Sequence, residues 1–393
     1  MPEKDRNNFF DELEEHSKIK LQVLKNYIKP WMRKILLSPH NNKSCLIVDT
    51  FAGVGKYDDG SLGSPLIITR EAIDCIKQLE KMHHKVDNIF LVFIEQKKES
   101  YKLLKKNLEE FLNQNLKEGV FNKVNNCGAL KITLINDTHE TFVENLLNDV
   151  DKLVPSFFFF DPFGFSVPFE LNKQLLQKYD LVELLINFMY EELTRFIELE
   201  SISESIKSLY GINSLDDIKD KIKGKKGKER REIITSLYKN QLINSGAKYT
   251  LNFDIQRNTG HFKMSLMYAT KNLIGFDTMK NVLNELSSTE GKKFEYWIDK
   301  DKGQLKLELY PKDEILVSEL ADYLFSNFKG ETIKSKDIIE KAMFHPYIPS
   351  KYYCKSMRLL NKNNKIKKIF RINGKNVRKN SFPKDCYIEF HDV

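Results

Sequence analysis

Four short apolar segments that each end in an acidic residue constrain the fold of this chain more than any other feature. They span residues 44–50, 88–95, 131–137 and 156–161, and their acids, at the last position or the one before it, are Asp49, Glu95, Asp137 and Asp161. Residues at helical spacing follow two of the segments, at 98–113 and 141–153. Buried strands that alternate with helices predict an α/β fold, a doubly wound Rossmann-like parallel sheet with helices on both faces. Because parallel strands end at a common edge, we expect the four acids to line one cleft.

The length of the chain predicts two domains, since 393 residues exceed what one hydrophobic core usually organises. Further expected elements are one or two helices in 9–37, a strand at 180–189, a helix at 191–209, a basic and mobile loop at 221–231, and an antiparallel hairpin of 248–256 with 262–270. We assign residues 1–290 to the Rossmann-like domain, with a basic insertion near 210–247. Residues 291–312 would form a connecting hairpin or linker.

Residues 313–393 show a different pattern, which predicts a second, basic domain. Three short helices are expected at 315–325, 338–343 and 351–361, followed by two strands at 365–375 and 385–390 around a Gly-containing turn. Three helices and a hairpin are the elements of a winged helix. We therefore expect a winged-helix-like domain.

Composition limits the class of protein. No apolar run approaches the ~18–20 residues that span a bilayer, so we expect no membrane insertion. The five cysteines stand singly, without a CxxC pair, and the eight histidines show no HxxxH or HxH spacing. We read the cysteines as reduced thiols of a cytoplasmic protein and assign no metal site. The net charge of +8 is modest, so its distribution is more informative than its sum.

A glycine-rich turn follows the first predicted strand. Gly53 and Gly55 stand two residues apart, but Asp58 takes the place of the third glycine of a dinucleotide fingerprint. This pattern favours a nucleoside without a pyrophosphate. Glu95 would then accept hydrogen bonds from ribose hydroxyls, and Asp137 would accept one from the amine of adenine. The alternative is that these acids only cap the helices that follow them.

The segment Asp161-Pro162-Phe163-Gly164-Phe165 is the most specific motif. The proline ends the strand rigidly and leaves the carboxylate and neighbouring carbonyls facing the cleft. Such acceptors can hold a planar NH₂ group and orient its nitrogen toward an electrophilic methyl group, while an aromatic ring stacks on the base. The alternative is an acidic turn beside a Phe-rich core strand.

Four segments together resemble the three-Cys-motif partner proteins, a family similar to class I S-adenosylmethionine-dependent methyltransferases. They are Asp49-Thr-Phe-Ala-Gly-Val-Gly-Lys-Tyr57, Gly63-Ser-Pro-Leu66, Phe159-Phe-Asp-Pro-Phe-Gly-Phe165 and Asn187-Phe-Met-Tyr190, and the likeness covers residues 15–279. More distantly, Val23-Leu-Lys25 with the same acids is similar to large-subunit ribosomal RNA adenine-N6 methyltransferases. These resemblances imply S-adenosylmethionine as cofactor. The cofactor-binding residues they imply are Lys25, Asp49, Phe51, Gly53, Gly55, Tyr57, Ser64, Glu95, Asp137 and Thr138.

The resemblance also implies an activity, with Asp161 holding the target amine and N6-methyladenine in RNA or DNA as the simplest product. One departure concerns the stacking residue. The adenine enzymes have Asp-Pro-Pro-Tyr where this chain has Asp161-Pro-Phe-Gly164, so Phe163 or Phe165 must replace the tyrosine. The alternative function is a catalytically degenerate nucleic-acid-binding or scaffold partner of a radical-SAM-like three-Cys-motif protein, with phage defence as one setting.

Basic residues gather in two places. Residues 351–384 contain twelve Lys or Arg and no Asp or Glu, and residues 221–231 contain seven basic residues. On a winged helix such a surface favours phosphate binding, and the alternative is an ordinary solvated face. The predicted nucleic-acid-binding residues are Lys225, Lys226, Lys228, Arg230, Lys367, Lys368, Arg371, Arg378 and Lys379.

Overall fold

The computed structural model describes residues 15–39, 43–162, 167–190, 203–257, 262–289, 293–298, 312–373, 377–378 and 380–392. The chain divides into two compact units, Met1–Asn272 and Leu273–Val393. Helix α10 therefore belongs to the second unit, although the sequence pattern favoured the first domain for its residues. No helix within the described ranges is long and apolar enough to cross a bilayer.

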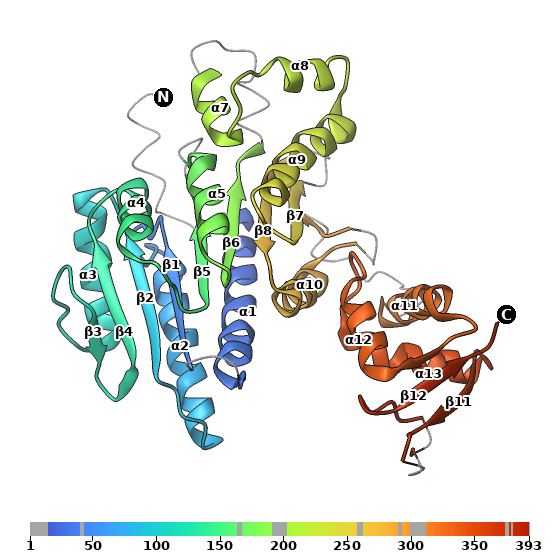
Figure 1. The fold of residues 1–393 in the computed structure, drawn as a ribbon. Helices are drawn as coiled ribbons and strands as arrows, with labels where there is room; N and C mark the ends of the chain where they lie inside the picture. Colours follow the sequence, from blue (N-terminus) through green and yellow to red (C-terminus); the bar gives the residue numbers. More distant parts are fainter. Residues whose placement is uncertain are drawn as a thin grey trace. The chain divides into compact units, whose positions relative to one another are not determined.

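A mixed sheet forms the centre of the first unit (Figure 1). Its strands are β1 (Ser44–Asp49), β2 (Asn88–Ile94), β3 (Asn122–Val124), β4 (Cys127–Ile135), β5 (Ser156–Phe160), β6 (Val182–Phe188), β7 (Tyr249–Arg257) and β8 (Phe262–Thr270). Within this unit the strand order is β3-β4-β2-β1-β5-β6-β8-β7. Strands β4, β2, β1, β5 and β6 run parallel, and β8 joins β6 antiparallel. The predicted α/β architecture with a mostly parallel sheet is confirmed.

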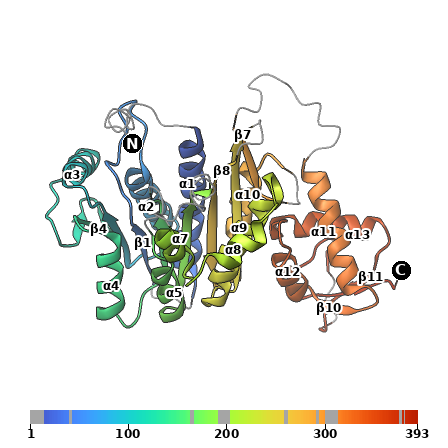
Figure 2. The ribbon, with the colours of Figure 1, turned by 90° about the horizontal axis from the view of Figure 1, so that it is seen from above.

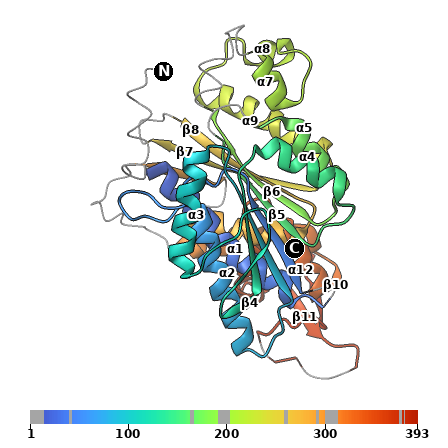
Figure 3. The ribbon, with the colours of Figure 1, turned by 90° about the vertical axis from the view of Figure 1, so that its left-hand side faces the viewer.

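Helices cover both faces of this sheet, as Figures 2 and 3 show. One face carries α1 (Glu15–Leu37), α2 (Ser64–Lys81) and α3 (Lys98–Leu112), and the other carries α4 (His139–Asp149) and α5 (Phe169–Lys178). Every residue of β1, β5 and β6 is buried, because these strands are covered on both sides. This explains why their sequences are continuous apolar runs instead of alternating patterns.

The chain order places a ligand crevice at one point of the sheet. From β1 the chain moves outward to β2 and β4, and then returns to add β5 on the other side of β1. Such a reversal opens a crevice beyond the carboxyl ends of the two central strands, which is where ligands bind in open α/β sheets. Asp49 ends β1, and Asp161 follows β5 directly.

Two elements differ from the sequence expectations. Strand β3 pairs antiparallel with β4 and was not predicted, since three residues give no periodic signal. The prediction of a mobile loop at 221–231 is wrong. Residues 221–231 form the end of α8 (Asp216–Ile222), a short turn, and the start of α9 (Gly227–Asn244). Ion pairs one helical turn apart, such as Lys228 with Glu232 at 3.7 Å, offset the repulsion that suggested disorder.

Helix α7 (Ser203–Tyr210) and α9 complete one side of the core of the first unit. Tyr210 and Tyr238 pack edge to face, with 5.9 Å between ring centroids, and Phe188 of β6 contacts both rings. The expected hairpin is confirmed as β7 and β8. The turn between them and most of the helix expected at 191–209 lie outside the described residues.

The second unit has a core of its own. Its elements are α10 (Leu273–Leu286), β9 (Glu295–Ile298), α11 (Lys312–Phe328), β10 (Thr332–Lys334), α12 (Ser335–Met343), η4 (Ser350–Tyr352), α13 (Tyr353–Lys362), β11 (Ile366–Phe370) and β12 (Tyr387–Phe390). The last three strands form an antiparallel sheet in the order β10-β12-β11. Helices α11, α12 and α13 pack on one core with residues of this sheet. The three helices and the two final strands were expected, and β10 was not.

A buried lysine joins α10 to the rest of the second unit. The ammonium of Lys280 donates to the carbonyls of Met343, His345 and Ile348 at 2.7, 2.8 and 3.2 Å. Burial is the main cause that lowers the pKa of Lys280 to about 8. Three carbonyl acceptors and Asp277, whose Oδ1 lies 3.4 Å away, compensate for the loss of water around this amine.

Candidate functional site in the crevice beyond β1 and β5

The glycine-rich turn after β1 has a backbone that only glycine adopts readily. Gly53 and Gly55 have φ angles of 62° and 78°, in the left-handed region. A Cβ atom on Gly55 would lie 2.9 Å from Cδ1 of Leu104, which is closer than an ordinary van der Waals contact. The amide of Gly63 donates to the carbonyl of Gly55 at 2.8 Å and fixes the far side of the turn. The two glycines therefore allow the left-handed backbone of this turn at the edge of the sheet.

Glu95 connects this turn to the end of β2. Its carboxylate accepts hydrogen bonds from the amide of Gly53 at 3.0 Å and from the amide of Lys97 at 2.8 Å. The side chain is half-buried. An ionised carboxylate offers about four lone-pair positions, so two remain for a ligand. The structure therefore brings the predicted ribose-binding acid directly against the predicted glycine turn.

The region after β4 combines a helix cap and an aromatic contact. The hydroxyl of Thr138 accepts from the amide of Thr141 at 3.1 Å and caps α4. Asp137 accepts from the amide of Thr138 at 2.7 Å. Thr138 therefore caps α4, and Asp137 stands one residue outside the cap, so the alternative that the acid itself caps this helix does not hold for Asp137. The ring of Phe51 lies 4.6 Å from the ring of His139, centroid to centroid, which joins the turn after β1 to the start of α4.

Asp161 lies in a polar cluster that was not predicted from the sequence. The ammonium of Lys20 lies 2.7 Å from Oδ1 and 2.5 Å from Oδ2 of Asp161. The side-chain amide of Asn187 donates to Oδ1 of Asp161 at 2.8 Å. Lys20 and Asn187 are 8% and 4% exposed. A lysine on the apolar face of a helix was the sequence signal that could have revealed the ion pair.

The packing of α1 explains how Lys20 reaches this position. The ring of Tyr27 lies 5.4 Å from that of Phe157 on β5, and its hydroxyl donates to the buried Glu183 on β6. Lys20 lies seven residues earlier, about two turns along the same face of the helix. Lys25, which the resemblance implied, is half-exposed on α1. The structure thus presents Lys20 to Asp161.

Asp49 is fully buried beside this cluster. Burial raises its pKa to about 7, the Ser64 hydroxyl opposes the rise, and the charge of Asp161 adds to it. Oδ1 accepts from the amide of Phe51 at 3.3 Å, while Oδ2 is buried without a hydrogen-bond partner among the described residues. Burial, with Asp161 and Asp49, also raises the pKa of Tyr57 to about 12. An orphaned buried carboxylate oxygen beside an open glycine turn fits a ligand that carries a cationic amine.

The structure thus brings several of the predicted cofactor and catalytic residues together at the carboxyl ends of β1, β2 and β5. Asp49, Tyr57, Ser64 and Asp161 interact with one another, and Gly53 and Glu95 are hydrogen-bonded beside them. Pro162 is buried. Phe163, Gly164 and Phe165 lie outside the described residues. In the part of the chain that the structure describes, no group of three or more His, Cys, Asp or Glu side chains could hold a metal ion.

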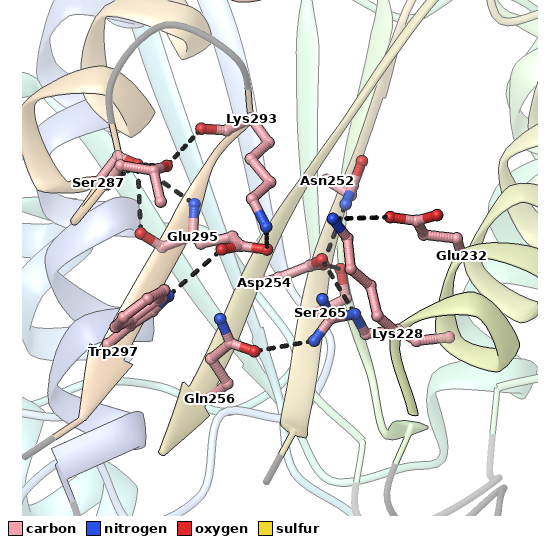
Figure 4. A network of polar contacts seen from close by, with 12 residues as sticks. Lys228, Glu232, Asn252, Asp254, Gln256, Ser265, Ser287, Lys293, Glu295 and Trp297 are labelled. Carbon is pink, nitrogen blue, oxygen red and sulfur yellow. Dashed lines mark hydrogen bonds and ion pairs between the residues drawn. The ribbon is translucent and has the colours of Figure 1, made fainter. Parts of the chain in front are cut away.

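The predicted nucleic-acid-binding residues of the first unit lie in helix α9 or just before it, and two of them form ion pairs with acids of the same helix. Lys225 pairs with Glu229, and Lys228 pairs with Glu232 (Figure 4). Arg230 is half-buried, while Lys226 is exposed. A polar network joins the helix to the hairpin, since Arg231 donates to Gln256 at 2.8 Å and Lys239 donates to Asn252 at 3.2 Å. Within the hairpin, Ser265 and Asn252 both donate to Asp254, at 2.7 and 2.9 Å (Figure 4). This surface is therefore less cationic than its sequence suggested.

The basic residues of the second unit divide into paired and unpaired groups. Lys367 lies 2.7 Å from Glu389, and Arg371 lies 2.9 Å from Asp385. Both acids come after the acid-free segment 351–384, so the fold supplies counter-charges that the segment lacks. Lys368 lies over the ring of Phe370 at 5.3 Å, and Arg378 is exposed. Lys379 lies outside the described residues.

Figure 4 also shows a polar cluster within the second unit, around Glu295 of β9. Lys293 pairs with Glu295, the indole of Trp297 donates to it at 3.3 Å, and the hydroxyl of Ser287 donates to its backbone carbonyl at 3.2 Å. These contacts fix β9 locally. We assign them no role in binding.

Comparisons with known proteins give structural similarity alone. No family model matches the chain, and no curated protein matches it. The O-methyltransferase from Bacillus cereus in complex with SAH is similar over 68% of this chain and 86% of its own, at 10% identity and a TM-score of 0.34. Trm1 from Pyrococcus horikoshii with S-adenosyl-L-methionine is similar over 87% and 76%, at 12% identity and a TM-score of 0.34.

The plantazolicin methyltransferase BamL, in complex with a triazolic desmethylPZN analog and SAH, is similar over 69% of this chain and 92% of its own. The identity is 12% and the TM-score is 0.30. The fold assignment rests on the strand order and pairing described above, and not on these similarities.

Proposed function

We propose that this chain is an S-adenosylmethionine-dependent methyltransferase of the three-Cys-motif partner type that acts on a nucleic-acid base. One observation carries the proposal. The carboxylate of Glu95 is hydrogen-bonded to the glycine turn after β1, in the same crevice as the acceptor Asp161. This arrangement provides a site for a nucleoside next to a site for an amine. Solved methyltransferases with bound SAM or SAH are among the similar structures, although the proposal does not depend on them.

The residues of the crevice fit the parts of S-adenosylmethionine. Glu95 has lone pairs left for the two ribose hydroxyls, and Oδ2 of Asp49 can accept from the amine of the methionine moiety. Asp137 and Phe51, at the neighbouring strand ends, suit the adenine amine and ring. When bound, the cofactor supplies an electrophilic methyl group. The protein contributes positioning and electrostatics, by which such a transfer is mainly accelerated.

Asp161 has the chemistry to hold the target. A carboxylate accepts hydrogen bonds from an exocyclic amine and orients the nitrogen lone pair toward the methyl group. Lys20 balances its charge in a site with little water. Adenine N6 is the simplest target, by similarity to the adenine-N6 enzymes, and Phe163 or Phe165 would supply the stacking ring.

The second unit suits contact with the nucleic acid. Helix α11, strand β10, helices α12 and α13, and strands β11 and β12 follow one another in the order expected of a winged helix. Exposed Lys355, Arg358 and Lys362 line one side of α13, and Lys368 and Arg378 add to the charge near the final hairpin. Lysine and arginine bind backbone phosphates and release counterions.

One observation favours a second function, a scaffold that has lost catalysis. The Lys20 ammonium already contacts both oxygens of Asp161, where a target amine would have to bind. In that case the crevice would serve a partner, such as a radical-SAM-like three-Cys-motif protein of the same cytoplasm. The two functions differ in whether methyl groups are transferred.

Titration of the full chain with S-adenosylmethionine by calorimetry tests the cofactor first. We expect saturable binding, and equal heats with buffer alone would contradict the proposal. Transfer of tritiated methyl to total RNA and to genomic DNA then tests the reaction, with Asp161→Asn as the control that should bind cofactor and transfer nothing. Cofactor binding without transfer, in the presence of the partner protein, would favour the scaffold.

A further inference from the structure

Asn187 is, beside Asp49, a residue of the crevice whose hydrogen bonding is incomplete among the described residues. It lies on β6, one position beyond the last paired residues of β5 and β6, Phe160 and Ile186. Asp161 occupies the matching position after β5, so the two side chains meet across the strand ends. The amide nitrogen of Asn187 donates to Oδ1 of Asp161 at 2.8 Å.

The orientation of the amide follows from chemistry. An ionised carboxylate accepts hydrogen bonds and donates none, so the NH₂ group of Asn187 must face Asp161. The carbonyl oxygen Oδ1 of Asn187 is then turned away from it. This oxygen is buried and accepts no hydrogen bond from any described residue. The residue is only 4% exposed, so bulk water does not solvate it freely.

An unpaired oxygen does not by itself identify a site. Oδ1 of Asn172, on α5, is also buried and unpaired, and the NH₂ group of Asn172 donates to the hydroxyl of Tyr238 at 3.3 Å. Asn172 packs within the core on the other face of the sheet. Asn187 differs because its amide is bonded to the acid that the proposed function assigns to the target.

We propose that Asn187 is a specificity-determining residue that accepts the second N–H of an exocyclic amino group, while Asp161 accepts the first. This inference rests on the proposed function and specifies its substrate class as bases with an NH₂ group. A carbonyl oxygen in the same place would face two acceptor oxygens, one of Asp161 and one of Asn187, and it could donate a hydrogen bond to neither. The pair therefore selects amino bases against their oxo counterparts.

The test measures this selection by binding and needs no methyl transfer. The full chain is saturated with SAH and titrated, by fluorescence anisotropy, into a labelled single-stranded oligouridine that carries one central adenine. A second oligonucleotide carries inosine, which replaces the amine by an oxo group. We expect the wild type to prefer adenine by about tenfold or more, because a site built for a donor rejects an analogue without it.

The variant Asn187→Leu keeps the branching at Cγ and removes the acceptor, so its preference should fall to within about threefold. Asn172→Leu is the matched control and should keep the wild-type preference. Affinity for SAH verifies that each variant is folded at the crevice. Asn187→Ser provides a second variant if Asn187→Leu fails to fold, and its preference should also fall.

The outcomes separate the inference from the proposed function. Failure to bind SAH contradicts the proposed function. Binding of SAH with equal affinity for adenine and inosine overturns the inference and leaves the cofactor assignment intact. A wild-type preference that survives in Asn187→Leu also overturns it, because Asn187 would then only hold Asp161 in place. Absence of any oligonucleotide binding overturns it for nucleic-acid bases.

Discussion

The ammonium of Lys20 on α1 contacts both carboxylate oxygens of Asp161, at 2.7 and 2.5 Å, across 141 residues of sequence. The first helix of the chain thereby contributes to a site built mainly from strand ends. Because the exposed fractions of the two side chains are only 11% and 18%, neither charge is well solvated without the other. This pair connects the N-terminal segment with the proposed chemistry.

Replacement of Lys20 by Met should reduce methyl transfer. Without the cation, the buried carboxylate of Asp161 loses its partner, which costs about 1–3 kcal/mol. Cofactor affinity should stay within a few-fold, as measured by calorimetry. The matched control is Lys29→Met, since Lys29 lies on the same helix and only approaches the half-exposed Asp74 at 3.9 Å. Equal rates of methyl transfer for Lys20→Met and the wild type would show that Lys20 has no effect on Asp161.

Replacement of Glu95 by Ala should weaken binding of S-adenosylmethionine by tenfold or more. Hydrogen bonds to a charged acceptor contribute about 1.5–3 kcal/mol each, and about 1.4 kcal/mol corresponds to tenfold in affinity. Calorimetry gives the affinity directly. Glu99→Ala removes an exposed acid on α3 and should change nothing. Equal affinities for Glu95→Ala and wild type would remove Glu95 from the cofactor site.

Cofactor affinity should rise with pH between 5.5 and 7.5, by about tenfold. Burial raises the pKa of Asp49 to about 7, so this carboxyl is neutral at the lower pH and becomes the anion that holds the cofactor amine at the higher pH. The amine itself stays protonated below ~7.7. Asp49→Asn should bind more weakly at pH 7.5 and lose the pH dependence, as followed by calorimetry.

The carboxyl of Asp49 should also make the stability of the cofactor-free protein depend on pH, and stability should fall where cofactor affinity rises. Its pKa is raised in the folded chain from an ordinary value of 3.8, so its contribution to stability is present below 3.8 and is lost as the pH rises through about 7. Thermal unfolding without cofactor should therefore show that the stability of Asp49→Asn increases relative to that of the wild type as the pH rises toward neutral. A constant difference across this range would contradict the raised pKa.

Nucleic-acid binding by the second unit should depend most on its unpaired cations. Lys362, Lys368 and Arg378 are exposed, and among the described residues no ion pair within 4 Å is formed by any of them, although the charge of Lys368 also acts on Glu389. Lys367 and Arg371 must exchange an existing ion pair for a phosphate. Replacing the three unpaired cations by Gln should weaken binding across sequences. The slope of log affinity against log salt should become shallower by about one unit for each phosphate that is no longer neutralised.

The control for this prediction replaces Lys77, Lys81 and Lys85 by Gln, three exposed cations near the end of α2. It removes the same net charge from a surface without a proposed role. If both triple variants lower the salt slope equally, the effect is one of net charge alone and the second unit is not a specific phosphate-binding surface.

The sequence by itself determined the long strands and their order of appearance, whereas the three-residue strands β3 and β10 were missed. The runs that became β1, β2, β5 and β6 are continuously apolar because both faces of the sheet are covered, and a local pattern of this kind needs no knowledge of distant contacts. The acids at their ends and the glycines of the turn after β1 could be located for the same reason. Parallel strands end at a common edge, which already placed Asp49, Glu95 and Asp161 together.

Tertiary structure decided what each of these side chains meets. Lys20 reaches Asp161, and Asn187 donates to it, because α1 and β6 pack beside β5, and no spacing in the sequence encodes that distance. Glu389 and Asp385 neutralise Lys367 and Arg371 from outside the segment that looked purely basic. Charge and hydrogen bonding act through space over a few ångströms, whereas the sequence orders residues only along the chain. The sequence therefore predicted a candidate site, and the packing of α1, β5 and β6 decided that Lys20 pairs with Asp161 and that Oδ1 of Asn187 has no partner among the described residues.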